Sequence, residues 1–324
     1  MGGYEELIRY FEDQLSKQAY GHEPGELYAP ISYTVGLVGK RIRPILTLMS
    51  CELFGGKKEE ALSQAIAIEL FHNFTLIHDD IMDNAPIRRG EETVFKKWNA
   101  NIAILSGDTL FALAYQYAQQ ARIDILPETL AVFSKTAIEV CEGQQFDLNY
   151  EDRNNVSVNE YIEMIRLKTA VLFGASLKIG ALVGGAKIKD ANALYEFGIN
   201  IGMGFQLKDD LLDTFGDEEV FGKQTGGDII SNKKTFLYLK ALEMADASAK
   251  TELISLYNTN GISNDEKTKR VKQIFEMLKV DRLTNQLIDR YYLEGMKKLD
   301  EISIEETNKE ILKDVAHRMI DRDK

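Results

Sequence analysis

Proline is scarce in this chain of 324 residues and is unevenly placed. The five prolines all lie at or before Pro127, so residues 128–324 contain none. A sheet-rich protein of this size would need proline and glycine turns at short intervals. The proline-free stretch instead repeats apolar residues with the i, i+3, i+4, i+7 period of helices. The sequence therefore predicts an all-α fold.

Cysteine and positive charge are also in short supply. Cys51 and Cys141 are the two cysteines, and their spacing fits neither a metal site nor a redox motif, which favours a reducing cytoplasm. Lysine and arginine number 39 against 51 acidic residues, a net charge of -12. An acidic surface argues against nucleic acid or an anionic membrane as the main partner. A local group of basic residues can still bind an anionic substrate.

Long hydrophobic runs are missing as well. The apolar stripe of residues 4–18 is interrupted by charge, so it fits neither a secretory signal nor a membrane span. Met1 and Gly2 match the start of a myristoylation motif, but Glu6 stands where serine or threonine is needed. We therefore expect a cytoplasmic protein with no membrane span.

Helical periodicity and turn residues divide the chain into long helices. They are expected at residues 4–18, 44–54, 58–83, 100–121, 128–148, 158–184, 190–214, 234–257, 264–279, 282–299 and 304–321. There is no linker and no low-complexity segment to mark a domain boundary. We expect one domain over residues 1–324, a large helical bundle.

Two aspartate pentads stand late in apolar helical segments. The first is Asp79-Asp80-Ile81-Met82-Asp83, and the second is Asp209-Asp210-Leu211-Leu212-Asp213. Residues four apart share a helix face, and like charges at that spacing repel each other. Either pentad alone is equally compatible with a solvated acidic helix end. Two of them in apolar helices favour a bound cation, and oxygen-only ligands suit magnesium held together with phosphate oxygens.

Basic residues flank both pentads. Individually each is compatible with an ordinary surface residue, but together they indicate two diphosphate sites, because arginine and lysine bind phosphate oxygens. They are Lys40, Arg43, Arg88, Arg89, Lys168, Lys223 and Lys233. His72 precedes Asp79 by two helical turns and so shares its face, although a packed core histidine is the alternative.

These motifs resemble the trans-isoprenyl diphosphate synthase (polyprenyl synthetase) family. The similarity covers Gly39–Pro44, His72–Asp83 with Arg88-Arg89-Gly90, Gly107-Asp108, Gly143-Gln144 with Asp147, Lys168-Thr169, and Phe205–Asp210 through Lys233, in the family's order. Residues after about 240 are not diagnostic. The resemblance implies the isoprenoid synthase fold around a central cavity, and a homodimer.

The resemblance also implies residue roles. Asp79, Asp83 and Asp209 would bind about three magnesium ions, with Asp80, Asp210 and Asp213 in support. The allylic diphosphate would be held by Arg88, Lys168, Thr169, Gln206, Lys223 and Lys233. Isopentenyl diphosphate would be held by Lys40, Arg43, His72 and Arg89. The implied reaction ionises the allylic diphosphate, adds isopentenyl diphosphate and loses a proton to pyrophosphate, without a protein nucleophile.

Product length, in this family, follows from the residues before the first pentad. Phe71, Phe74 and Thr75 lie eight, five and four positions before Asp79. A bulky fifth and a small fourth residue resemble the geranylgeranyl pattern; a farnesyl or longer product is the alternative. A terpene cyclase would lack the second pentad and the Lys40–Arg43 site. A non-catalytic subunit of a heteromeric synthase would have decayed pentads, whereas both are intact here.

Overall fold

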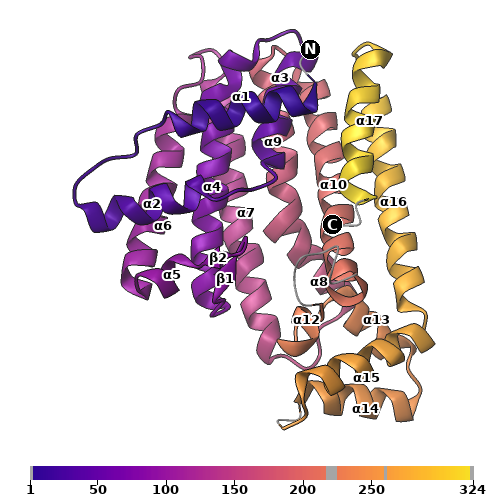
Figure 1. The fold of residues 1–324 in the computed structure, drawn as a ribbon. Coiled ribbons are helices and arrows are strands. Elements are labelled where there is room, and N and C mark those ends of the chain that lie inside the picture. The colour runs from indigo at the N-terminus through magenta and orange to yellow at the C-terminus, as the bar shows by residue number, and fades with distance from the viewer. Residues whose placement is uncertain (1–2, 217–224, 259–260, 322–324) are drawn as a thin grey trace. The chain divides into compact units, whose positions relative to one another are not determined.

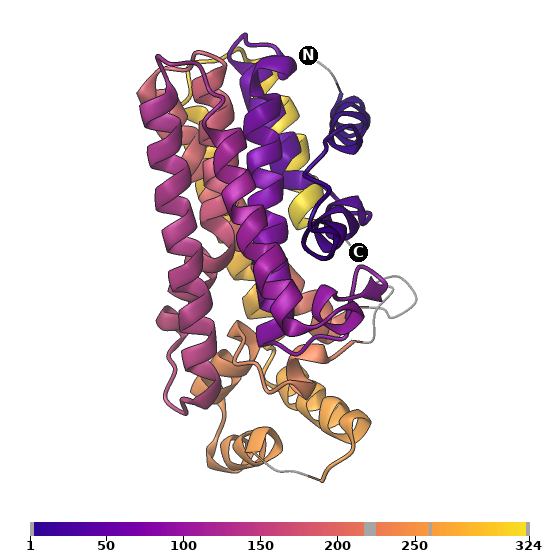
Figure 2. The same cartoon turned by 90° about the vertical axis from the view of Figure 1, so that its left-hand side faces the viewer.

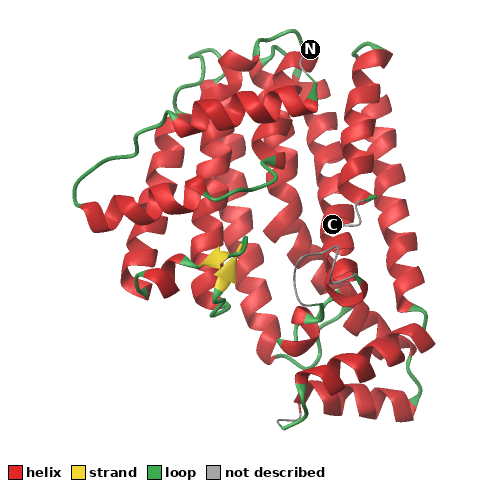
Figure 3. Cartoon of the chain, viewed as in Figure 1, coloured by secondary structure: helices red, strands yellow, loops and turns green. Residues whose placement is uncertain are grey.

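The computed structural model describes residues 3–216, 225–258 and 261–321. Helices account for most of these residues, and a single two-stranded hairpin is the only sheet within the described part of the chain (Figure 3). The predicted all-α fold is confirmed. The chain divides into two compact units, residues 1–136 with 172–195 and residues 137–171 with 196–324. The assignment of residues 1–324 to one domain stays a prediction.

The first unit is built around a pair of long neighbouring helices, α4 and α6, which run side by side in Figures 1 and 2. Its elements are α1 (Tyr4–Ser16), α2 (Gly25–Gly36), α3 (Ile42–Leu53), the 3-10 helix Lys58–Ala61, α4 (Leu62–Met82), β1 (Ile87–Arg88), β2 (Glu91–Glu92), α5 (Val94–Lys97) and α6 (Ala100–Ala118). The beginnings of α7 (Leu126–Asp152) and α10 (Ile188–Phe215) and nearly all of α9 (Val171–Val183) also belong to it.

Helix α4 places the first pentad at the point where burial ends. Residues 64–71 of α4 are all buried, whereas Asp79, Ile81 and Met82 of the last turn are open to solvent, partly or fully. The few polar side chains inside this stretch have partners, as when Gln64 donates to the Ala118 carbonyl at 3.2 Å. This apolar helix is thus buried along most of its length, and its solvent-accessible carboxylates lie at its C-terminal end.

The second unit carries the remaining helices. They are the later parts of α7 and α10, α8 (Val158–Ile165), the π turn Arg166–Ala170, α12 (Gly227–Ile230), α13 (Phe236–Met244), α14 (Ala247–Asn258), α15 (Asn264–Met277), α16 (Val280–Asp300) and α17 (Glu306–Ile320). Helices α16 and α17 lie side by side (Figure 1). Among the described helices, none is both long and apolar enough to cross a membrane.

The observed helices differ from the expected ones in three places. Helix α2 was not predicted, because Pro30 lies inside it and proline interrupts the helical pattern. The segment expected as one helix over 158–184 contains a π turn at residues 166–170. The segment expected as one helix over 234–257 is two helices, α13 and α14, separated at Ala245 and Asp246.

Candidate functional site

The first pentad occupies the last turn of α4. The Asp83 N–H donates to the Asp79 carbonyl at 2.8 Å, so these two residues are one helical turn apart, as the spacing predicted. Both side chains are half-buried. Carboxylates at a helix C-terminus face the negative end of the helix dipole, which adds to their mutual repulsion. The local electrostatics therefore favour a bound cation at this end of α4.

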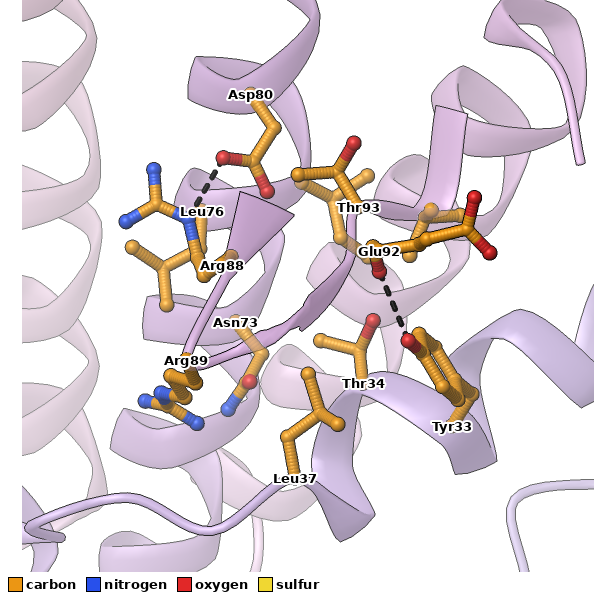
Figure 4. A pocket seen from close by; sticks show the side chains of 12 residues that line it. Tyr33, Thr34, Leu37, Asn73, Leu76, Asp80, Arg88, Arg89, Glu92 and Thr93 are labelled. Carbon is orange, nitrogen blue, oxygen red and sulfur yellow. Dashed lines mark hydrogen bonds and ion pairs between the residues drawn. The ribbon is translucent and has the colours of Figure 1, made fainter. Parts of the chain in front are cut away.

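The middle aspartate of the pentad turns inward and meets an arginine of the hairpin. Arg88 Nε lies 2.6 Å from Asp80 Oδ1 (Figure 4). Arg88 Nη2 lies 3.3 Å from Asp79 Oδ2. Burial raises the pKa of Asp80 to about 6, although Arg88 acts in the opposite direction. The hairpin itself is fixed at Glu92, whose carbonyl accepts a 2.8 Å hydrogen bond from the Tyr33 hydroxyl.

A cluster of cationic residues accompanies the pentad within the first unit. Arg43 Nη1 lies 3.2 Å from His72 Nε2, and the Arg43 guanidinium lies 4.4 Å from the centre of the Phe173 ring. Burial, together with Arg43, holds the pKa of His72 well below its ordinary value, so this imidazole is neutral at pH 7. Lys40, three residues before Arg43 in the chain, is exposed. The cluster joins residues that are far apart in sequence.

Arg89 is the cation of this cluster that remains available. Its side chain is half-buried, and within the part of the chain that the structure describes it makes no hydrogen bond and no ion pair. Burial lowers the pKa of Arg89, and the nearby cations Arg41 and Arg88 add to this effect, although the charge of Glu69 acts in the opposite direction. Such a guanidinium is suited to binding an anion.

The second pentad lies in the last two turns of α10. Asp209 and Asp213 are half-buried, whereas Asp210 is buried. The Tyr161 hydroxyl donates to Asp210 Oδ2, and Gln206 Nε2 donates to Asp210 Oδ1 at 3.0 Å. Burial is the largest influence and raises the pKa of Asp210 to about 7. The middle carboxylate is again held inside the protein, here by neutral donors.

The π turn brings the predicted diphosphate residues toward α7 and α10. Lys168 Nζ lies 2.6 Å from Asp147 Oδ2, and Thr169 Oγ1 donates to Gln206 Oε1 at 3.0 Å. A Cβ atom on Gly143 would lie 2.3 Å from the Lys168 nitrogen, so only glycine permits this approach of the two backbones. Thr169, Gln206 and Asp210 consequently form one hydrogen-bonded chain.

Asp228 is a site residue that the sequence reasoning missed. Its N–H donates to Asp213 Oδ2 at 2.9 Å, and its carbonyl accepts from the Lys233 N–H at 2.8 Å. Burial, followed by the charge of Asp213, raises the pKa of Asp228 well above its ordinary value. Tyr161 was missed as well. The sequence analysis relied on regularly spaced motifs, and neither Asp228 nor Tyr161 belongs to one. Lys223 lies outside the described residues.

Aromatic rings surround the residues that precede the first pentad. Phe74 stacks on Phe111 of α6 with ring centres 5.0 Å apart, and Phe71 lies 5.6 Å from the ring of Phe133 on α7. Thr75 donates its hydroxyl to the His72 carbonyl at 2.8 Å. Phe74 thus rests against a continuous aromatic layer.

No group of three histidine, cysteine, aspartate or glutamate side chains within the described residues can hold a metal ion on its own.

Comparisons with known proteins identify the family. The polyprenyl synthetase model matches residues 24–278. A geranylgeranyl diphosphate synthase of Methanosarcina mazei is 40% identical over 303 residues, 93% of this chain and 91% of its own. A crystal structure of a geranylgeranyl pyrophosphate synthase is 44% identical, with a TM-score of 0.95 and 99% of both chains covered.

A further similar structure was solved with bound ligands. It is a polyprenyl synthase from Caulobacter crescentus CB15 complexed with calcium and isoprenyl diphosphate, 25% identical to this chain, with a TM-score of 0.87 over 100% of this chain and 99% of that one. The family-model match covers well over half of the chain, and the Methanosarcina relative is covered nearly throughout. The chain belongs to the polyprenyl synthetase family of prenyltransferases.

Proposed function

We propose that this chain catalyses the head-to-tail condensation of an allylic diphosphate with isopentenyl diphosphate, ending at geranylgeranyl diphosphate. The observation that carries the proposal is the matched pair of pentads. In each, a buried middle aspartate anchors the segment while two half-buried carboxylates one turn apart stay partly open to solvent. The geranylgeranyl diphosphate synthases similar to this chain support the same product.

The donor chemistry of the pentads fits magnesium. Asp79, Asp83 and Asp209 would be its direct ligands, with Asp80, Asp210 and Asp213 in support, around about three ions. The described residues contain no closed cluster of protein ligands, which suits an ion that completes its shell with water and substrate phosphate. Bound magnesium would neutralise the charge that develops on the leaving diphosphate.

The allylic diphosphate would be held by residues of both pentad regions: Arg88, Lys168, Thr169, Gln206, Lys223 and Lys233. Arg88 already lies against Asp79 and Asp80, and Thr169 and Gln206 are hydrogen-bonded to each other. Hydroxyl, amide and cationic donors of this kind suit non-bridging phosphate oxygens. The contacts that support this assignment each lie within one of the two units.

Isopentenyl diphosphate would be held by Lys40, Arg43, His72 and Arg89. The neutral His72 is bonded to Arg43, so its ring adds a hydrogen-bonding group without adding charge. Arg89 supplies a half-buried guanidinium that makes no hydrogen bond and no ion pair with the described residues. The carbon–oxygen bond of the allylic diphosphate breaks, the double bond of isopentenyl diphosphate attacks the cation, and pyrophosphate accepts the released proton.

Product length would be set by Phe74, with Phe71 and Thr75 beside it. The aromatic layer behind Phe74 supports this role, since a ring stacked on Phe111 is held in place and excludes water from the cation. We expect Phe74→Ala to shift the products toward longer chains, measured by chromatography of the dephosphorylated prenols. Tyr115→Phe, which keeps the ring and removes only a hydroxyl bonded to Ser134, is the control and should leave the products unchanged. An unchanged product distribution in Phe74→Ala would contradict the assignment.

We further propose that the enzyme is a cytoplasmic homodimer. Both cysteines are free thiols, with Cys51 buried and Cys141 exposed, which is typical of proteins in a reducing compartment. Light scattering of the purified chain tests the dimer directly. A monomeric mass at assay concentration would contradict it.

The experiment that tests the activity is elongation by the purified chain alone. Isopentenyl diphosphate is supplied with dimethylallyl, geranyl or farnesyl diphosphate, with magnesium or with chelator. Magnesium-dependent formation of geranylgeranyl diphosphate supports the proposal. A different chain length would retain the reaction and overturn the product, while hydrocarbon released without isopentenyl diphosphate would indicate a cyclase. Absence of any turnover would indicate a subunit that needs a partner.

A further inference from the structure

We propose that Arg41, which lies between two predicted substrate ligands without being one itself, is the positioning residue for the isopentenyl diphosphate site. The inference rests on the proposed function, because the residues it positions are Lys40, Arg43, His72 and Arg89. Arg41 is buried, and its side chain is 1% exposed. A charged side chain inside the protein is retained only where several acceptors surround it.

Four acceptors from three helical regions surround the Arg41 guanidinium. Nε donates to Glu12 of α1 at 2.7 Å, and Nη1 donates to Glu69 of α4 at 2.5 Å. Nη2 donates to the carbonyl oxygens of Val35 and Leu37 at 2.8 and 2.9 Å. These carbonyls lie where α2 ends at Gly36, so Arg41 also satisfies groups that the end of that helix leaves open.

The backbone of Arg41 is as constrained as its side chain. Its φ is +48°, in the left-handed region that residues other than glycine and asparagine seldom adopt. The residue immediately precedes α3, which begins at Ile42. The four hydrogen bonds thus hold a strained turn between α2 and α3, and that turn determines where Lys40 and Arg43 project.

The ion pair with Glu69 fixes the position of this turn along the axis of α4. Glu69 is one helical turn before His72, so Arg41 contacts α4 through Glu69 while Arg43 contacts it through His72 at 3.2 Å. Asn73 Nδ2 donates to Glu69 Oε1 at 3.1 Å and to the Glu69 carbonyl at 2.8 Å, which fixes the carboxylate. Two adjacent turns of one helix therefore set the register of the segment.

The same turn governs the fourth ligand. A Cβ atom on Gly39 would lie 2.8 Å from Arg89 Cζ, so the Arg89 guanidinium packs directly on the Gly39 backbone. Lys40 and Arg43 belong to the segment of residues 39–43. His72 is hydrogen-bonded to Arg43 of this segment, and Arg89 packs against its Gly39. Displacement of Arg41 would move all four groups relative to one another, and binding of a diphosphate is sensitive to such misplacement.

The test separates positioning from stability with two variants. Arg41→Lys keeps the charge but loses the planar fork that reaches four acceptors. Arg41→Met combined with Glu69→Met removes both members of the buried ion pair together, so neither of the two is left charged without the other. For both we expect the KM for isopentenyl diphosphate to rise about tenfold or more, with the KM for the allylic substrate changed less than about threefold.

Arg122→Lys is the matched control, because Arg122 also donates to a backbone carbonyl, that of Val183 at 3.2 Å, and to an acid, Asp124. It should leave both KM values unchanged, and circular dichroism checks the folding of each variant. If Arg41→Lys fails to fold, the double variant decides. Unchanged KM for isopentenyl diphosphate, or equal rises for both substrates, would overturn the inference. Absence of elongation by the unsubstituted chain would instead overturn the proposed function.

Discussion

The two aspartate pentads have nearly the same sequence but solve the problem of a buried carboxylate differently. In the first, Asp80 is paired with a cation, Arg88 of the hairpin. In the second, Asp210 is held by the Tyr161 hydroxyl and the Gln206 amide, both neutral. Burial raises both pKa values, to about 6 for Asp80 and about 7 for Asp210. The shared motif thus gives the two outer carboxylates the same one-turn spacing in both pentads. The partner of the buried middle aspartate differs, because it comes from elsewhere in the chain.

Removal of an outer carboxylate should have the largest effect and should be equal at the two pentads. We expect Asp79→Asn and Asp209→Asn each to lower kcat/KM about 10³-fold, roughly 4 kcal/mol of transition-state stabilisation, because each removes a proposed magnesium ligand. Steady-state kinetics over a range of magnesium concentrations measures this. If either variant kept the wild-type dependence of kcat/KM on magnesium concentration, the two pentads would not be equivalent magnesium ligands.

Replacement of the inner aspartates should separate the pentads through stability. The folded-state pKa of Asp210 lies above its unfolded value of 3.8, so its contribution to stability falls as pH rises from about 4 to above 7. We expect Asp210→Asn to raise the free energy of unfolding of the metal-free chain by about 1–3 kcal/mol at pH 8, and by less at pH 5.

Asp80→Asn is the matched comparison, and it should give a smaller gain or a loss, because it removes the negative charge that pairs with Arg88 at 2.6 Å. Urea unfolding at the two pH values, with chelator present, gives all four numbers. Equal gains for the two variants would show that the partner makes no difference.

Removal of the tyrosine hydroxyl should sharpen the contrast further. The hydrogen bond from Tyr161 lowers the pKa of Asp210, so Tyr161→Phe should raise that pKa and keep Asp210 protonated to higher pH. We expect kcat/KM at pH 7 to fall about tenfold and to recover partly by pH 8.5. The pH profile is the readout, and a loss that is uniform across pH would indicate a purely structural role for the hydroxyl.

His72 should give the smallest effect. Its folded-state pKa is depressed, so its stabilising contribution is present above the unfolded value of about 6.5 and is lost as pH falls below it. Against His72→Gln, the wild-type free energy of unfolding should decline by up to about 1 kcal/mol per pH unit between pH 6.5 and 5.5. Parallel pH dependence of the two proteins would contradict a neutral His72.

The sequence predicted what depends on spacing. Asp79 and Asp83 are four apart, and the structure places them one turn apart at the end of α4. It did not predict partners that lie far along the chain, such as Tyr161, which is 49 residues from Asp210. Arg41 belongs to a recognised motif, yet its four acceptors are defined only once α1, α2 and α4 have packed.

Local exceptions to the usual helix rules were also not predicted from the sequence. Helix α2 was not predicted and continues through Pro30, because a helix tolerates a missing N–H when packing compensates. The π turn at residues 166–170 inserts into a pattern that reads as one continuous helix. That turn carries Lys168 and Thr169, so the sequence indicated these residues without indicating the geometry that directs them to Asp147 and Gln206.

The most direct test of the central claim is product analysis with the purified chain, isopentenyl diphosphate and farnesyl diphosphate, in magnesium or in chelator. The account predicts geranylgeranyl diphosphate with magnesium and no product with chelator. Elongation that persists in chelator, or no elongation in magnesium with any allylic primer, would contradict it.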